Sequence, residues 1–275
     1  MVTSYLNDKF AKKIVLILFL VLSIWWAVLF FYFHAQLNQS NLIWAACYQA
    51  VAILGGIWGL LISRKWGGLK SVMGRAIFFF ALGLFLQVFG QTVFSIYGLF
   101  LRVPVPYPSL ADIGFFGSIP CYIYAVFELG KASGTTISMK SFSKKLLALL
   151  VPLLGLSISY SIFLRNYEFD WSAPLRIFFD FGYPLGQAIY TSFAVLVYIL
   201  SKQFLGGIMK NKVLFILIAL VIQYIADYNF LYQFSVNTWI NGGYGDYIYL
   251  FSYFIMAMGL INLGQVFREL KEASV

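Results

Sequence analysis

Histidine and cysteine are scarce in this chain of 275 residues. The single histidine, His34, excludes a bis-histidine haem or a histidine-rich metal site within one chain. The two cysteines, Cys47 and Cys121, fall inside apolar runs and form no C-x-x-C motif, so we expect small buried hydrophobic side chains. There is no glycine-rich phosphate loop either. The sequence therefore predicts neither a metal site nor a cofactor.

Charged residues are also few, at 11% of the chain, whereas 61% is hydrophobic. Soluble domains carry about 25% charged residues, so the balance indicates a membrane protein. Apolar runs reach the ~20 residues that a bilayer-crossing helix needs, and the first is too long for a cleavable signal peptide. The sequence predicts an all-α membrane protein with eight transmembrane helices, at residues 14–36, 43–63, 75–101, 111–130, 145–164, 175–200, 212–233 and 246–267.

The basic residues lie in alternate loops between these runs. The formal net charge is +9, and 16 of the 19 basic residues fall on one side, which leaves Arg102, Arg165 and Arg176 on the other. Cytoplasmic loops are enriched in Lys and Arg, so both termini are predicted to be cytoplasmic in a multi-pass protein of the plasma (inner) membrane. Because topology accounts for the basic surplus, we expect contact with membrane lipids and no nucleic-acid partner.

Polar residues recur in the two halves of the chain. Three pairs appear in the same order, with offsets of 138, 136 and 134 residues: Gln49 and Gln187, Gln87 and Gln223, Asp112 and Asp246. The sequence therefore predicts two tandem four-helix repeats, residues 1–134 and 135–275. Since four is an even number, the copies share one orientation, related by a pseudo-twofold axis along the membrane normal.

Acidic residues within the apolar runs concentrate toward one side of the membrane. An Asp near a helix centre costs about 2.5–3.5 kcal/mol to insert, so it usually has a specific role. With the predicted topology, five polar side chains gather in the outer half of the bilayer: Asp112, Asp180, Asp227, Asp246 and Gln91. Glu128 is the exception, near the inner end of its helix.

Each of these side chains also has a structural interpretation. Asp112 follows Ser109 by three residues, as in a helix capping box, and Asp246 could cap its helix in the same way. Asp180 and Asp227 could form hydrogen bonds inside the bundle, take part in ligand binding or catalysis, or relay a proton. The intramembrane glutamines are expected to bond across helices: Gln49, Gln87, Gln187 and Gln223.

Aromatic residues make up 20% of the chain, with 29 Phe, 19 Tyr and 7 Trp. Interfacial belts explain part of this content. The alternative is an aromatic-lined pocket for a flat or acyl ligand. Helix irregularities at Pro120 and around Pro184 would open space for such a pocket.

The segment "PYPSLADIGFFGSIPCYIYAVFEL" resembles the multi-pass N-terminal regions of bacterial and archaeal diguanylate cyclases and sensor histidine kinases, which carry a P-x-P-S-x-A-D turn before an aromatic helix. The resemblance covers roughly residues 75–267 and includes "YPLGQ" at 183–187 and the Gly245-Asp246 helix start. Gln187 stands where the family usually has an acid, and Ile119-Pro120 where Tyr-Pro is common. The resemblance implies a membrane sensory or scaffold role, with the final helix leading toward a cytoplasmic effector.

Two functional hypotheses follow. The first is a non-enzymatic sensor whose ligand-binding cavity is formed by the four aspartates with Gln91, Gln87 and Gln223, and which signals to a cytoplasmic partner through the C-terminal helix. The ligand would be a small or hydrophobic molecule. The alternative is an intramembrane hydrolase similar to lysoplasmalogenases, with catalytic Asp227, Asp246 and Asp112, in which two close carboxyl groups share a proton. The repeat also leaves transport open.

Overall fold

The computed structural model describes residues 8–33, 39–133, 141–165, 167–201, 208–235 and 238–272. These residues form helices and connecting turns, with no β-strand among them. The α-helices are α1 (Asp8–Ala27), α2 (Gln39–Cys47), α3 (Ala50–Lys65), α4 (Val72–Ser95), α5 (Leu110–Ala132), α7 (Phe142–Ser159), α8 (Pro174–Ser201), α9 (Ile208–Ser235) and α10 (Tyr244–Glu272). Three of them continue into π-helical turns, at Val28–Tyr32, Ile96–Leu101 and Tyr160–Leu164, and a short 3-10 helix covers Gly68–Lys70.

Eight helical spans are long and apolar enough to cross a membrane, which confirms the predicted class and the predicted number of spans. The first span begins at Asp8, six residues before the predicted start. The second, Gln39–Lys65, was predicted as one helix but is interrupted at Tyr48–Gln49, between α2 and α3. His34 and the predicted boundary between repeats at 134/135 lie outside the described residues.

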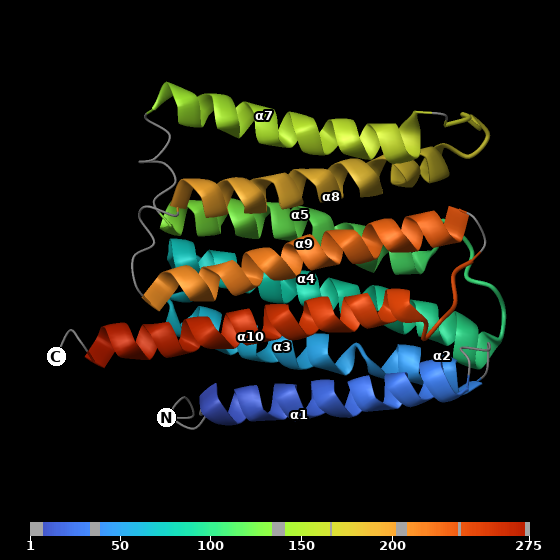
Figure 1. The fold of residues 1–275 in the computed structure, drawn as a ribbon, viewed down its shortest axis with the longest axis horizontal. Coiled ribbons are helices and arrows are strands. Elements are labelled where there is room, and N and C mark those ends of the chain that lie inside the picture. Colours follow the sequence, from blue (N-terminus) through green and yellow to red (C-terminus); the bar gives the residue numbers. More distant parts are fainter. Residues whose placement is uncertain are drawn as a thin grey trace.

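The helices lie side by side along the long axis of the molecule, and both termini emerge at the same end (Figure 1). We call this the terminus end and the opposite end the cavity end. Six helices pack in a closed ring, in the order α3, α4, α5, α8, α9 and α10, with α10 returning to α3. Outside the ring, α1 packs on α10 and more lightly on α3, whereas α7 packs on α8.

Glycines let α4 and α5 approach each other closely. A Cβ atom on Gly114 of α5 would lie 2.4 Å from the Leu86 carbonyl oxygen, and one on Gly83 of α4 would lie 2.3 Å from the Tyr122 ring. Small residues at such contacts are typical of membrane helices, whose association depends on close packing rather than on the hydrophobic effect. These contacts fix α4 against α5 along the middle of α4.

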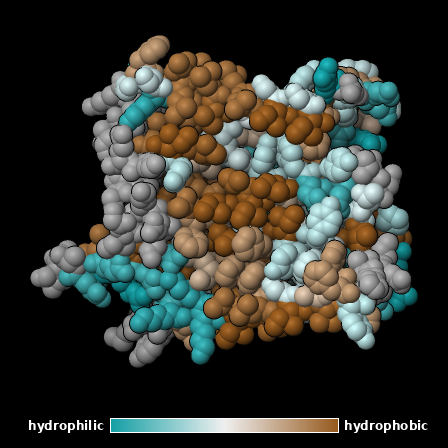
Figure 2. Space-filling model, in the orientation of Figure 1, coloured by the Kyte–Doolittle hydropathy of each residue, from teal (hydrophilic) through white to brown (hydrophobic). Residues whose placement is uncertain are grey.

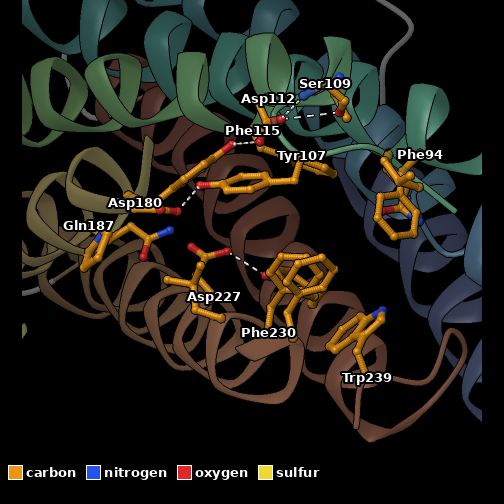
Figure 3. Close-up of a pocket in the computed structure, with 18 of the residues that line it drawn as sticks. Phe94, Tyr107, Ser109, Asp112, Phe115, Asp180, Gln187, Asp227, Phe230 and Trp239 are labelled. Carbon is orange, nitrogen blue, oxygen red and sulfur yellow. Dashed lines mark hydrogen bonds between the residues drawn. The ribbon is translucent and has the colours of Figure 1, made fainter. Parts of the chain in front are cut away.

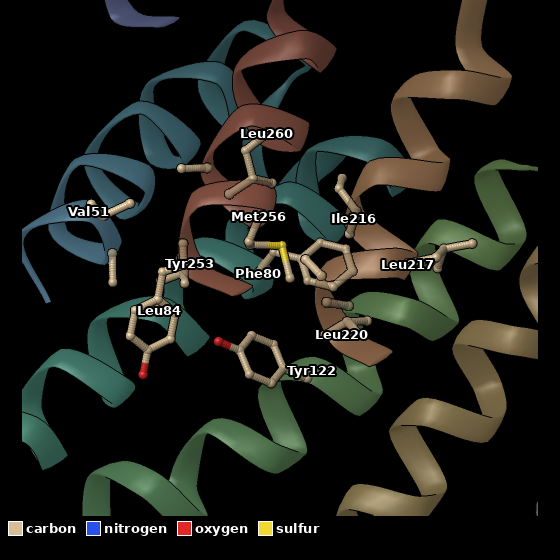
Figure 4. Close-up of a cluster of buried hydrophobic side chains, with 14 of the residues drawn as sticks. Val51, Phe80, Leu84, Tyr122, Ile216, Leu217, Leu220, Tyr253, Met256 and Leu260 are labelled. Atoms are coloured by element: carbon tan, nitrogen blue, oxygen red, sulfur yellow. The ribbon is translucent and has the colours of Figure 1, made fainter. Parts of the chain in front are cut away.

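The centre of the ring is filled by large apolar side chains (Figure 4). They come from five helices and are buried, with Phe80, Leu84, Ile216, Leu220 and Leu260 among the most enclosed. Figure 2 shows hydrophobic residues over the middle of one face and hydrophilic ones toward its ends, as expected for a bilayer protein. The two cysteines are free and only partly buried, not fully buried as expected.

At the terminus end, buried acids are paired with basic side chains. Glu128 lies 2.8 Å from Arg75 Nη2 and 2.8 Å from Lys131 Nζ. Asp8, which is fully buried, lies 2.8 Å from Arg268 Nη2 and 3.5 Å from Lys65 Nζ. Neither Asp8 contact has hydrogen-bond geometry, so the attraction there is between charges.

Candidate functional site

A cavity of about 310 Å³ lies at the cavity end of the ring. Its walls come from Tyr48 at the break in the second span, the ends of α4 and α9, the starts of α5, α8 and α10, and the segments before α5 and α8. Five of the seven residues predicted from the sequence line it: Gln91, Asp112, Asp180, Asp227 and Asp246. Figure 3 shows several of these side chains converging from different helices on one space.

Asp112 caps helix α5 and also faces the cavity. Its Oδ2 atom accepts a 2.6 Å hydrogen bond from the Ser109 amide, and Ser109 in turn accepts from the Ala111 amide, so the capping box is present. The other carboxyl oxygen accepts a 2.7 Å bond from the Tyr183 hydroxyl group of α8. Helix capping therefore accounts for Oδ2 of Asp112, whereas the hydrogen bond from Tyr183 to the other carboxyl oxygen joins α5 to α8.

Asp246 combines the same two features at the start of α10. Its Oδ2 atom accepts a 2.6 Å hydrogen bond from the backbone amide of Gly242, which has a φ of 71° in the left-handed region that favours glycine. A Cβ atom on Gly242 would lie 2.9 Å from the Asn41 carbonyl oxygen. Tyr48, at the break in the second span, interacts with the Asp246 carboxyl group from the neighbouring span.

Asp227 lies in the body of α9 and caps nothing. Its Oδ1 atom accepts a 2.7 Å bond from the Tyr249 hydroxyl group and a 3.3 Å bond from the Gln223 amide, and its Oδ2 atom accepts a 3.3 Å bond from the Tyr190 hydroxyl group. These donors come from α8, α9 and α10. Asp227 therefore joins three helices at the floor of the cavity.

Asp180 of α8 receives two tyrosine hydroxyl groups. Tyr107 donates to Oδ1 at 2.8 Å and Tyr167 donates to Oδ2 at 2.7 Å, while Arg176 Nε lies 3.7 Å away. The pKa of Tyr167 is raised to about 12. The main cause is desolvation, and the hydrogen bond to Asp180 and the charge of Asp180 add to it. The same causes raise the pKa of Tyr107 above its ordinary value. Both phenols remain donors to the carboxylate.

The glutamines predicted as binding residues do not all reach the cavity. Gln87 donates to Ser118 at 2.8 Å and accepts from Tyr253 at 3.1 Å, and Gln223 accepts from Ser252 at 3.1 Å. Neither lines the cavity wall. These two join helices beneath the cavity, as the packing interpretation predicts.

Gln187 behaves differently from the other intramembrane glutamines. Its side chain is only 4% exposed and lines the cavity, and its Oε1 atom is buried without a hydrogen-bond partner among the described residues. The expectation that it bonds across helices is not met at this oxygen. An unpaired buried acceptor costs about 1–3 kcal/mol, so the position requires a reason. In Figure 3, the amide nitrogen of Gln187, rather than Oε1, is turned toward the carboxyl groups of Asp180 and Asp227.

Sequence reasoning missed the tyrosines as a set. Each aspartate interacts with at least one: Asp112 with Tyr183, Asp180 with Tyr107 and Tyr167, Asp227 with Tyr190 and Tyr249, and Asp246 with Tyr48. The high aromatic content was a signal, and the aromatic-lined pocket was considered as an alternative to interfacial belts. Which tyrosines meet which acids depends on helix packing, which spacing along the chain does not determine.

A second cavity of about 330 Å³ adjoins the first. The two share Gln91, Phe94, Val105 and Phe234 in their walls. The second cavity is lined mainly by apolar residues of α4 and the segment that follows it, including Leu99 and other residues of the π-helical turn at Ile96–Leu101. The aromatic rings of Phe94 and Phe234 thus line both the acid-lined space and its neighbour, whose described lining residues include no acid.

Within the described ranges, no group of three or more His, Cys, Asp or Glu side chains is arranged to hold a metal ion. The chemistry that the cavity offers is hydrogen bonding, charge and aromatic surface. A comparison with protein-family models, curated proteins and solved structures finds no match to this chain.

Proposed function

We propose that this protein is a membrane-embedded ligand-binding module that senses a small molecule in its acid-lined cavity and passes the signal through the end of α10. The observation that carries the proposal is the course of α10, a single helix from Tyr244 to Glu272. Its first three turns supply Asp246, Tyr249 and Tyr253 to the cavity. Its last turns are held by α1 and by the end of α3.

The contacts at the far end of α10 are specific. Lys12 donates a 2.6 Å hydrogen bond to Gln265, Trp66 donates a 3.0 Å bond to the Leu263 carbonyl oxygen, and Arg268 pairs with Asp8. A ligand that forms hydrogen bonds with residues at the start of α10 would shift the whole helix, because α10 is continuous. The other end of α10 would then move against the polar contacts that hold it. Signalling then requires only that the ligand bind more tightly to one position of α10 than to another.

The distribution of charge supports an orientation for this module. Arg64, Lys65, Lys70 and Arg75 lie together at the terminus end, between α3 and α4, whereas the cavity end has fewer basic residues. By the positive-inside rule the terminus end would be cytoplasmic and the cavity would open toward the outside. The ligand would then be extracellular or drawn from the outer leaflet, and the signal would reach the cytoplasm.

The tandem repeat belongs to the same proposal. A repeat of four spans makes the contact between α3 and α10 equivalent to the contact between α8 and α5, and both contacts occur. The outer helices fit the repeat less well, since α1 packs mainly on α10 but α7 packs on α8. We infer a duplicated ring of six helices with two peripheral helices that have diverged.

The hydrolase hypothesis uses the same cavity but requires two carboxyl groups that share a proton. Among the described residues, Asp112 bonds to Tyr183, Asp227 bonds to Tyr249 and Asp246 bonds to the Gly242 amide, rather than to one another. Tyrosine and amide donors stabilise carboxylates as acceptors. This arrangement favours binding over acid–base catalysis, and we therefore rank the hydrolase second.

The test is a cytoplasmic reporter enzyme fused after Val275, screened against lipid and metabolite fractions in membranes. We expect at least one fraction to change reporter output, and the change to disappear in Asp227→Asn. The matched control is Asp170→Asn, because Asp170 is exposed, bonds to Ser172 and does not line the cavity. Output that no fraction alters, or that responds equally in both variants, contradicts a sensing role for the cavity.

A further inference from the structure

Gln187 carries an amide nitrogen that faces the cavity without a hydrogen-bond acceptor. The side chain is 4% exposed, its Oε1 atom is buried, and neither Oε1 nor Nε2 bonds to a described residue. The nitrogen is turned toward the carboxyl groups of Asp180 and Asp227 but bonds to neither (Figure 3). A polar group that is removed from water and left unpaired costs about 1–3 kcal/mol. The amide nitrogen is therefore free to bond to an acceptor that enters the cavity.

The other glutamines inside the bundle show that this is an exception. In the described part of the spans, four of them use Nε2 as a donor: Gln49 to the Ala46 carbonyl oxygen, Gln87 to Ser118, Gln91 to the Ala45 carbonyl oxygen and Gln223 to Asp227. Gln91 lines the same cavity as Gln187, yet its nitrogen is already used within the protein. The free donor thus belongs to one position in the cavity wall.

The two acids beside this nitrogen restrict the ligand atom that can fill the position. A carboxylate or phosphate would bring further acceptors against Asp180 and Asp227, an ammonium group has no acceptor for the nitrogen, and an ether oxygen has no donor for the acids. A hydroxyl group both accepts and donates. The acids can still accept, because a carboxylate has about four acceptor positions, whereas Asp180 receives two hydrogen bonds and Asp227 receives three. A hydroxyl oxygen therefore matches both sides of this position.

Away from Gln187 the available space becomes apolar. Rings of Phe94, Phe230 and Trp239 line the first cavity, and in Figure 3 Phe94 lies on the opposite side of that cavity from Gln187. Phe94 and Phe234 also line the second cavity, whose volume is about 330 Å³ and whose described lining residues include no charged side chain. The two adjoining cavities thus offer one polar end, at Gln187, and an apolar extension past Phe94.

We infer that the cavity binds an uncharged amphiphile, a hydroxyl group on an alkyl chain. The hydroxyl oxygen accepts from Gln187 Nε2 and donates to a carboxyl oxygen of Asp180 or Asp227. The alkyl chain passes along the aromatic rings and enters the second cavity beside Phe94 and Phe234. This inference rests on the proposed function and names its ligand class.

The experiment is calorimetric titration of the full chain in lipid nanodiscs with 1-butanol, 1-octanol and 1-dodecanol. Empty nanodiscs of the same lipid are the blank, because alcohols also partition into the bilayer. Three analogues of 1-octanol test the head group: 1-methoxyheptane accepts but does not donate, octylammonium donates but does not accept, and octanoate is an anion that only accepts. We expect 1-octanol to bind about tenfold more tightly than each analogue, because each of them loses at least one hydrogen bond.

One variant tests the position of the head group. Gln187→Leu should weaken binding of 1-octanol about tenfold and leave binding of octylammonium unchanged, because only the alcohol accepts from Nε2. The comparison of two ligands on one variant separates the loss of a hydrogen bond from a general loss of folded protein. Gln49→Leu is the control, because Gln49 bonds to Ala46 and Thr92 and lines neither cavity.

A second variant tests the position of the alkyl chain. Gly98 lines the second cavity, and a Cβ atom there would lie 3.4 Å from Leu42, which lines the same cavity. Gly98→Leu should therefore take up space in the second cavity, weaken binding of 1-dodecanol about tenfold and leave binding of 1-butanol unchanged. Gly117→Leu is the control, because Gly117 lines neither cavity and its Cβ atom would lie 3.8 Å from Leu86.

The outcomes separate the ligand class from the sensing function. If no alcohol binds beyond the blank, or if octylammonium or octanoate binds more tightly than 1-octanol, the inferred class is wrong. Equal weakening of 1-octanol by the Gln187 and Gln49 variants, or of 1-dodecanol by the Gly98 and Gly117 variants, also overturns the inference. If 1-octanol binds as expected but the fused reporter does not respond to it, the class holds and the sensing function fails. If the reporter responds only to ligands of another class, sensing holds and the inferred class fails.

Discussion

The two ends of the helix bundle treat buried acids in opposite ways. At the terminus end, Asp8 and Glu128 are each paired with two basic side chains. At the cavity end, Asp112 and Asp227 have no basic partner among the described residues and accept hydrogen bonds from tyrosine hydroxyl groups instead. The first arrangement places positive charges beside the acids, whereas the second supplies hydrogen bonds from neutral groups.

This difference separates acids that hold helices together from acids that are available to a ligand. A carboxyl group bonded only to neutral phenols has no counter-ion within the protein, so its oxygen atoms remain available to a ligand that enters the cavity. A carboxylate between an arginine and a lysine has little attraction left. The contrast predicts that removing a charge at the terminus end changes stability, whereas removing a charge at the cavity end changes binding.

The largest effect on stability is expected for Arg268→Ala, which removes the ion pair between Arg268 of α10 and Asp8 of α1. Among the described residues, Asp8 would keep one basic partner, Lys65 at 3.5 Å. Removing one partner of a buried ion pair costs about 3–5 kcal/mol, and we expect about 3 kcal/mol because Lys65 remains. Thermal unfolding in detergent, followed by circular dichroism, measures the loss. Arg268→Lys should recover part of the lost stability. Wild-type stability in Arg268→Ala would contradict a structural role for the ion pair.

The cavity end should be sensitive to backbone packing rather than to charge. Gly114→Ala places a methyl group 2.4 Å from the Leu86 carbonyl oxygen, where α4 and α5 are closest. Overpacking of this kind costs about 1–3 kcal/mol. Gly117→Ala is the matched control on the same helix, because its methyl group would lie 3.8 Å from Leu86. Equal unfolding temperatures for the two variants would show that α4 and α5 are not held this tightly.

A pair of isosteric substitutions compares the two kinds of acid directly. Glu128→Gln removes attraction to Arg75 and Lys131, whose side chains are partly exposed, so we expect a loss of about 1 kcal/mol. Asp227→Asn retains an acceptor for Tyr249 and removes no cation, so we expect a change within about 0.5 kcal/mol. Chemical unfolding of both proteins measures the difference. A larger loss for Asp227→Asn would reverse the assignment of the two ends.

Much of the fold follows from hydropathy alone. Runs of about 20 apolar residues have few alternatives to a membrane helix, so all eight spans could be predicted. The break at Tyr48–Gln49 was missed because both flanking segments are apolar and no proline or glycine marks it. The order of helices in the ring was also beyond the sequence, since hydropathy identifies the spans but does not say which of them are neighbours.

The cavity residues were predicted as far as charge and topology reach. The four aspartates and Gln91 were placed at one end because alternate spans run in opposite directions. The sequence could not separate Gln187, which has an unpaired oxygen, from Gln87, which is fully bonded. Both are intramembrane glutamines, and only the packing of neighbouring helices decides which of them meets a partner.

The smallest expected effect concerns pH and tests the tyrosine–carboxylate pairs at the mouth of the cavity. The pKa of Tyr167 is raised to about 12, above the value of about 10 for a free tyrosine, by desolvation and by Asp180. Its neutral form is therefore favoured by folding, and this stabilisation is complete below pH 10 and is lost as pH rises through 12. The difference in free energy of unfolding between wild type and Tyr167→Phe should therefore become smaller as the pH rises from about 10 to about 12. Asp180→Asn should shift the narrowing to lower pH, because the negative charge is gone, and a difference that stays constant from pH 9 to 12 would mean that Tyr167 does not donate to Asp180.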